Sequence, residues 1–227
     1  HLGLELGAVR TSFYQNFKNT KWLSHPYNCH VDKIHVFGIA VQVGLQIPPT
    51  LITNKKQDVL DFMKEHKSIV VKNIAFTLPF FIDDRVYSTY TVKMSNKIFK
   101  KYSDKFFPTA FQKLIEKEYE VRAFYIDKKI YSMAIFSQQN NSTKLDFRRN
   151  SLIPNRTVPY RLPNEICKKI RLLMDELSLN TGSIDLIKTK EDFVFLEVNP
   201  VGQFGMVSQP CNYYLEKKVA NFLSNEK

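Results

Sequence analysis

The sequence predicts an α+β protein built as two lobes. Stretches with apolar residues at helical spacing alternate with β-branched, strand-like runs, and this pattern changes near residue 109. Before that point helices and short strands are mixed, whereas strands follow one another after it. A basic and aromatic passage closed by Pro108 predicts the boundary. The expected division is a remnant of a further N-terminal domain at 1–30, a small lobe at 31–108 and a large lobe at 109–227.

The composition is that of a globular protein. The chain has 227 residues, is 44% hydrophobic and contains no run of about 18 apolar residues, so no membrane span is expected. Three cysteines lie far apart and form no CxxC pair, which predicts a reducing, cytoplasmic environment. The net charge of +11 is dispersed and no aromatic and basic RNA motif is present, which argues against a nucleic-acid partner. His1 stands where an initiator Met is expected, so we expect most of an N-terminal domain to be absent.

The helices and strands follow from spacing and from stop signals. A helix beginning at Asp32 is predicted to bury Ile34, Phe37, Val41 and Leu45. The helix at 163–179 has the clearest apolar stripe, at Ile166, Ile170, Leu173 and Leu177. The other predicted elements are strands at 50–53, 68–72, 110–115, 119–126 and 130–138, a helix after Asn54 and a final helix carrying Leu215, Val219 and Phe222.

A hairpin near the C-terminus carries the strongest chemical signal. Two apolar, β-branched runs at 182–187 and 193–199 flank a polar loop, which is typical of an antiparallel pair. Facing residues in such a pair have a constant index sum, so Asp185 is predicted to lie opposite Glu197 and Asn199. Two carboxylates and an amide oxygen are the hard ligands that Mg²⁺ accepts.

Structural explanations exist for the same residues. Asp185 could be a solvated strand residue, and Glu197 could pair with a lysine. Glu197 has apolar neighbours on both sides, however, and an acid inside such a strand is costly without a role, which favours the metal site. Glu120 and Arg122 share one face of their strand, and this pattern fits a lined cleft and a structural ion pair equally well.

An ordered set of motifs resembles the ATP-grasp ligases across nearly the whole chain from about residue 31. The set consists of Asp32-Lys33, Ile47-Pro48, Val70-Val71-Lys72, Asp146-Phe147-Arg148, Ile184-Asp185-Leu186 and Glu197-Val198-Asn199-Pro200. The stretches at 111–122 and 196–205 are similar to those of the maturases that make graspetides, namely the microviridin-type and grasp-with-spasm enzymes. The chain departs from many ATP-grasp enzymes because no glycine occurs between Asn73 and Val92, where a phosphate-covering flap is expected.

The resemblance implies roles for individual residues. Lys33 and Lys72 would contact the phosphates of ATP, and Glu118 would lie near the ribose. A hinge between the lobes, formed by Gln112, Lys113, Leu114 and Ile115, would read the adenine. The catalytic arginines would be Arg122 and Arg148, and the Mg²⁺ ligands would be Asp185, Glu197 and Asn199.

The resemblance also implies a reaction. An ATP-grasp fold with ATP between its lobes would use ATP and Mg²⁺ to phosphorylate Glu or Asp side chains of a ribosomally made precursor peptide with a leader and an acidic core. Thr or Ser hydroxyls or Lys amines of the same peptide would then attack to form macrocycles, and a homodimer is possible. Two alternatives stay open: another carboxylate–amine ligase, acting like RimK on a protein or joining amino acids, and a module that binds nucleotide or peptide without catalysis. No Ser/His or Cys/His nucleophile pair is evident, which fits direct attack on an acyl phosphate.

Overall fold

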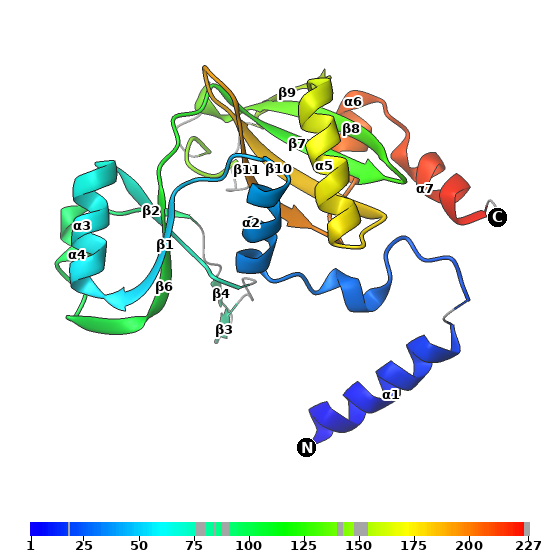
Figure 1. Cartoon of the computed structure of the whole chain (residues 1–227), viewed down its shortest axis with the longest axis horizontal. Coiled ribbons are helices and arrows are strands. Elements are labelled where there is room, and N and C mark those ends of the chain that lie inside the picture. The colour runs from blue at the N-terminus through cyan, green and yellow to red at the C-terminus, as the bar shows by residue number, and fades with distance from the viewer. Residues whose placement is uncertain are drawn as a thin grey trace.

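The fold contains two main antiparallel sheets, seen side by side in a computed structural model of the chain (Figure 1). The structure describes residues 1–17, 19–75, 80–83, 85–87, 91–139, 143–147 and 154–224. Helices and antiparallel sheets together confirm the predicted α+β class. In the described part of the chain, no helix combines the length and apolar character needed to cross a membrane.

A four-stranded sheet has the order β1-β6-β2-β5. Its strands are β1 (Thr50–Lys55), β2 (Ile69–Lys72), β5 (Val92–Lys93) and β6 (Lys105–Lys113). The helices α3 (Lys56–His66) and α4 (Asn96–Phe99) lie beside it, and a core around Val59, Ile69, Met94 and Phe111 joins them. A separate hairpin is formed by β3 (Phe80–Ile82) and β4 (Arg85–Tyr87).

A five-stranded sheet has the order β11-β10-β7-β8-β9. Its strands are β7 (Tyr119–Ile126), β8 (Lys129–Phe136), β9 (Arg156–Tyr160), β10 (Thr181–Lys188) and β11 (Phe193–Asn199). One face packs on α2 (Lys33–Gln42) and α5 (Asn164–Glu176), and the other on α6 (Gly205–Cys211) and α7 (Leu215–Ser224) (Figure 1). Because side chains alternate along a strand, Val121 and Ala123 face α5, while Phe124 faces α6.

The first helix lies apart from both sheets. α1 (Leu2–Asn16) buries none of its side chains and extends away from the rest of the chain (Figure 1). The short helix η1 (Pro26–Cys29) follows. Just before it, Ser24 Oγ accepts hydrogen bonds from the backbone N–H groups of Asn180 and Thr181 at 3.1 Å. This contact joins the start of the chain to β10.

The predicted helix at Asp32 exists, but only half of its predicted core residues are confirmed: Leu45 is buried and Phe37 packs against the core. Asp32 caps α2, since its Oδ1 accepts from the N–H groups of Ile34 and His35 at 2.9 Å. Val36, Ile39 and Ala40 are the buried residues of α2, whereas Ile34 and Val41 are about half exposed. The helix is apolar on most of its circumference, so spacing alone did not distinguish the face that packs on the sheet. In α5, by contrast, Ile166, Ile170 and Leu173 are buried as predicted.

The observed sheets divide the chain at other places than the predicted lobes. β6 runs from Lys105 to Lys113 and pairs with β1 and β2, so the chain leaves the four-stranded sheet after Lys113 and not at Pro108. α2 precedes β1 in sequence but packs in the core of the five-stranded sheet. The predicted boundary at residue 108 missed the full length of β6 and the packing of α2. Strand pairing and helix docking join segments that are distant in the sequence, so local patterns do not show them.

Candidate active site

A cavity of about 670 Å³ is lined by residues from both sheets. One side is built by β2, β5 and β6, and the other by β7, β10, β11 and the segment 143–147. The predicted site residues that line it are Lys33, Lys72, Gln112, Lys113, Leu114, Ile115, Asp185 and Glu197. The fold therefore gathers eight of the twelve predicted residues around one space.

The two predicted metal-binding carboxylates face each other in the hairpin. Asp185 on β10 is the partner of Glu197 on β11, as the index sum predicts. The register shifts after this pair, because Leu186 faces Phe195 and leaves Leu196 as an extra residue. Asp185 is buried, while the Glu197 side chain is 26% exposed. Both residues thus lie at a bulge and line the cavity.

Asn199 lies two pairs further along the hairpin. Its partner across the strands is Ser183 and not Asp185, so this part of the predicted pairing is wrong. Asn199 is exposed, it does not line the cavity, and its Oδ1 accepts a hydrogen bond from the N–H of Val201 at 3.1 Å. The described residues contain no group of three His, Cys, Asp or Glu side chains that could hold a metal. A metal here would depend on Asp185, Glu197 and a neutral oxygen such as that of Asn199, with substrate oxygens completing its shell.

Arg122 is paired with Asp185. The two residues are neighbours across β7 and β10, and Arg122 Nη1 lies 3.0 Å from both carboxylate oxygens. Both side chains are more than nine-tenths buried, and Arg122 Nε has no hydrogen-bond partner within the described ranges. Arg122 does not line the cavity, so it acts on that space through Asp185. Arg148, the second predicted arginine, lies outside the described residues.

Lys33 and the connection between the sheets complete the predicted set. Lys33 Nζ lies 3.5 Å from Glu197 Oε2, at the start of the helix that Asp32 caps. Gln112 is buried and donates from Nε2 to Thr50 Oγ1 at 3.0 Å. The N–H of Leu114 donates to the carbonyl of Ser68 at 2.9 Å. These contacts attach the predicted hinge to the four-stranded sheet.

Glu118 lies at the edge of this region. Its side chain is about half exposed and reaches only to 4.0 Å from Lys188 Nζ, and Glu118 does not line the cavity. Its predicted contact with a ribose stays a prediction.

The cavity residues that were not predicted include two buried carboxylates and a lysine that pairs with one of them. Lys117 and Glu120 form a buried ion pair on the cavity wall, and Asp146 is buried in the same wall. Glu120 thus lines the cleft as one prediction had it, while Glu120 and Arg122 form ion pairs with different residues, Lys117 and Asp185. Asp146 lies in the Asp-Phe-Arg motif, which could have indicated it, whereas no local signal distinguishes Lys117 from other lysines.

Comparison with known proteins identifies the fold family. A family model described as the RimK-like ATP-grasp domain matches residues 30–223. The chain belongs to this family. The predicted resemblance to the ATP-grasp ligases is therefore confirmed, together with the ATP-grasp fold.

Solved ATP-grasp structures agree with this assignment. A RiPP-associated ATP-grasp ligase from Chryseobacterium gregarium, in complex with ADP and a leader and core peptide, has a TM-score of 0.84 at 25% identity, over 97% of this chain and 67% of the other. The macrocyclase MdnC from Microcystis aeruginosa, bound with the precursor peptide MdnA, has a TM-score of 0.80 at 27% identity, over 99% and 71%. The ATP-grasp ligase PsnB, complexed with a minimal precursor variant, Mg and ADP, has a TM-score of 0.76 at 16% identity, over 98% and 68%. No curated protein sequence matches the chain.

Proposed function

We propose that this chain is an ATP-dependent ligase that forms rings in a ribosomally made peptide. It would activate Glu or Asp side chains of the peptide and join them to Thr or Ser hydroxyls or to Lys amines. The observation that carries the proposal is the facing pair Asp185 and Glu197, which opens on the same cavity as Lys33 and Lys72. The similarity to ligases solved with leader, core or precursor peptides supports a peptide as the substrate.

The donor set fits a magnesium ion and a triphosphate. Asp185 and Glu197 supply hard carboxylate oxygens, and Asn199 lies on the same face of β11 as Glu197, with a carbonyl lone pair beyond the one that accepts from Val201. Bound Mg²⁺ would neutralise charge on the phosphates during their transfer. Lys33 is paired with Glu197 in this structure. A metal bound to Glu197 would replace Lys33 as its counter-charge, and Lys33 could then contact the phosphates.

The proposed reaction has two steps, phosphorylation of a carboxylate and its attack by a nucleophile of the same peptide. An oxygen of the peptide carboxylate attacks the γ-phosphorus of ATP, and the bond to the bridging oxygen breaks, which releases ADP and gives an acyl phosphate. A hydroxyl or amine of the peptide then attacks the acyl carbon, loses its proton to solvent, and releases phosphate. The lysines of the cavity would stabilise the phosphoryl oxygens, while Arg122 holds the Asp185 carboxylate in place. Each linkage thus removes one water from the peptide.

The test uses the full chain with ATP, Mg²⁺ and an acidic candidate precursor peptide, followed by mass spectrometry. We expect the peptide to lose the mass of one water for each linkage, with one ADP formed per linkage. A parallel reaction with EDTA should leave the peptide unmodified. ADP formation with free amino acids or a protein tail, but not with the peptide, would replace this proposal by a different carboxylate–amine ligase. Absence of ADP formation with every acceptor would favour a module that binds without catalysis.

A further inference from the structure

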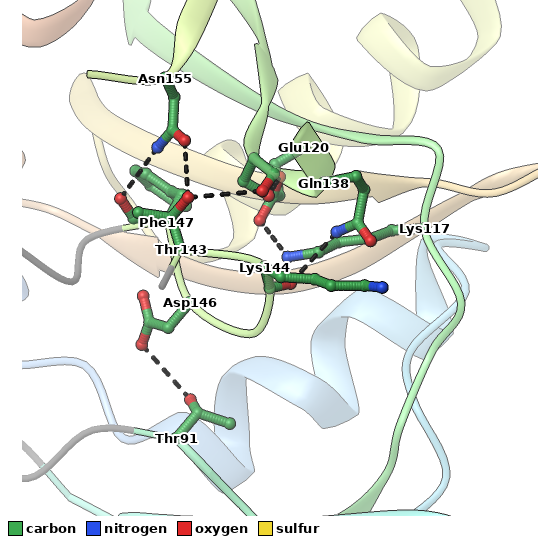
Figure 2. A network of polar contacts seen from close by, with 10 residues as sticks. Thr91, Lys117, Glu120, Gln138, Thr143, Lys144, Asp146, Phe147 and Asn155 are labelled. Carbon is green, nitrogen blue, oxygen red and sulfur yellow. Dashed lines mark hydrogen bonds and ion pairs between the residues drawn. The ribbon is translucent and has the colours of Figure 1, made fainter. Parts of the chain in front are cut away.

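A buried carboxylate joins two parts of the cavity wall. Glu120 is 4% exposed, and each of its oxygens has its own partner. Oε1 pairs with Nζ of Lys117, in the connection between β6 and β7 (Figure 2). Oε2 accepts a hydrogen bond from Oγ of Ser137 at 2.6 Å. An acid at this depth is costly unless it is paired, and here both oxygens are satisfied.

Ser137 connects Glu120 to the segment 143–147. It is fully buried and begins η2 (Ser137–Gln139), directly after β8. Oγ1 of Thr143 lies 3.4 Å from the Ser137 carbonyl and donates to Oδ1 of Asn155 at 2.7 Å. Asn155 in turn donates from Nδ2 to the carbonyl of Phe147 at 3.3 Å (Figure 2). Both ends of the segment are thus attached to this network.

A further contact holds the middle of the segment. Gln138, also in η2, donates from Nε2 to the carbonyl of Lys144 at 3.1 Å. η2 therefore positions the segment at two places, while Glu120 fixes the beginning of η2 through Ser137.

The segment 143–147 forms the wall that meets the four-stranded sheet. Lys144, Leu145, Asp146 and Phe147 all line the cavity. Asp146 Oδ2 lies 3.5 Å from Oγ1 of Thr91, which immediately precedes β5, and the two side chains point toward each other in Figure 2. The position of this segment therefore decides where Asp146 meets the other side of the cavity.

We propose that Glu120 is a positioning residue that holds two walls of the cavity in place relative to each other. Through Lys117 it fixes the connection that follows the predicted adenine hinge, and through Ser137 it fixes the segment 143–147. This inference rests on the proposed function in assigning the connection to the nucleotide and the segment to the peptide. The arrangement predicts that the two branches of the network can be separated by mutation.

The Ser137 branch is tested by Ser137→Ala, with Ser132→Ala as the matched control. Ser132 is also a buried serine, on the strand β8 that precedes η2, and its hydroxyl donates to the carbonyl of Tyr160 at 2.6 Å, away from the cavity. We expect Ser137→Ala to raise KM for the peptide about five- to tenfold, as the loss of one buried hydrogen bond does, with KM for ATP unchanged. Ser132→Ala should lower stability to a similar extent and leave both KM values unchanged.

The Lys117 branch is tested by Glu120→Gln. The amide keeps an acceptor for Ser137 but removes the charge that neutralises Lys117. We expect KM for ATP to rise about tenfold, because the connection at 114–118 is loosened and a cation is left without its partner. A rise in peptide KM from this variant and an unchanged ATP KM would overturn the assignment of the branches.

Hydrogen exchange decides the inference without any turnover. In Ser137→Ala, backbone amides at 137–139 and 143–147 should exchange faster than in the wild type, while those of β10 and β11 stay protected. Ser132→Ala should leave the segment unchanged. Equal exchange in all three proteins would overturn the inference, whatever the activity. If the segment exchanges faster in Ser137→Ala but the wild-type protein modifies no peptide, the result would count against the proposed function alone.

Discussion

The two sides of the cavity differ in their charged residues. On the four-stranded sheet, the charged residues that line the cavity are the lysines Lys72, Lys93 and Lys113. On the other side the carboxylates Glu120, Asp146, Asp185 and Glu197 line the cavity, together with the lysines Lys33 and Lys144. In the proposed function the lysines would attract a triphosphate and the carboxylates a divalent cation, so the two sides together would orient a metal–nucleotide complex.

The two sides also differ in how firmly their charges are held. Asp185 and Glu120 are buried on β-strands and paired with Arg122 and Lys117. Lys93 and Lys113 are exposed, and a lysine carries its charge on a flexible four-carbon chain. The acidic side is therefore fixed before a ligand binds, whereas the lysines adjust to it. Substitutions on the acidic side should have the larger effects.

The largest effect is expected for Asp185→Asn. The change removes a carboxylate from the predicted metal site and leaves Arg122 buried without its counter-charge. We expect turnover to fall about 100- to 1,000-fold, and the free energy of unfolding to fall by about 3–5 kcal/mol. ADP release and a denaturant titration measure these two quantities.

The control for this variant is Asp175→Asn, which breaks the exposed pair of Asp175 with Lys128. Such a surface pair contributes about 1 kcal/mol or less, and activity should be unchanged. If Asp185→Asn retained wild-type turnover, Asp185 would be a structural residue only.

A smaller effect is expected on the basic side from Lys72→Met. Methionine keeps the apolar length of the chain and removes the charge that would contact a phosphate. We expect KM for ATP to rise about tenfold, with little change in stability because Lys72 lies at the end of β2. Initial rates at varied ATP concentration give this value.

Lys64→Met on α3 is the comparison, since Lys64 is exposed and pairs only with Asp61 among the described contacts. An ATP KM that is the same in both variants would remove Lys72 from the nucleotide site.

The smallest effect concerns the turn that closes the acidic side. A Cβ at Gly202 would lie 2.3 Å from Oγ and 2.8 Å from the backbone nitrogen of Ser183, the residue two before Asp185. We expect Gly202→Ala to destabilise the protein by about 1–3 kcal/mol, because β10 or the turn must shift. Thermal or denaturant unfolding measures the loss.

Gly205→Ala serves as the control, since nothing lies within 4 Å of a Cβ at Gly205. Equal stability of the two variants would show that β10 and the turn adjust without cost. The acidic side would then be less rigid than its buried pairs indicate.

The sequence determined what depends on neighbours along the chain. Strand alternation placed Glu120 and Arg122 on one face of β7, and the constant index sum of a hairpin placed Asp185 opposite Glu197. The buried apolar face of α5 could also be predicted, because a clear polar face distinguishes it from the exposed side. In each case the signal is periodic or local.

Only the tertiary structure decided which distant groups meet. Arg122 reaches Asp185 because β7 and β10 are adjacent in the sheet, although the residues are 63 positions apart. Glu120 meets Ser137 because η2 follows β8, and Asp146 meets Thr91 because two sheets face one cavity. Periodicity contains no information about such pairings, since they depend on strand order and on how one layer packs on another. The sequence thus determined the chemical groups of the site and the hairpin that carries two of them, and the packing of the sheets decided their partners.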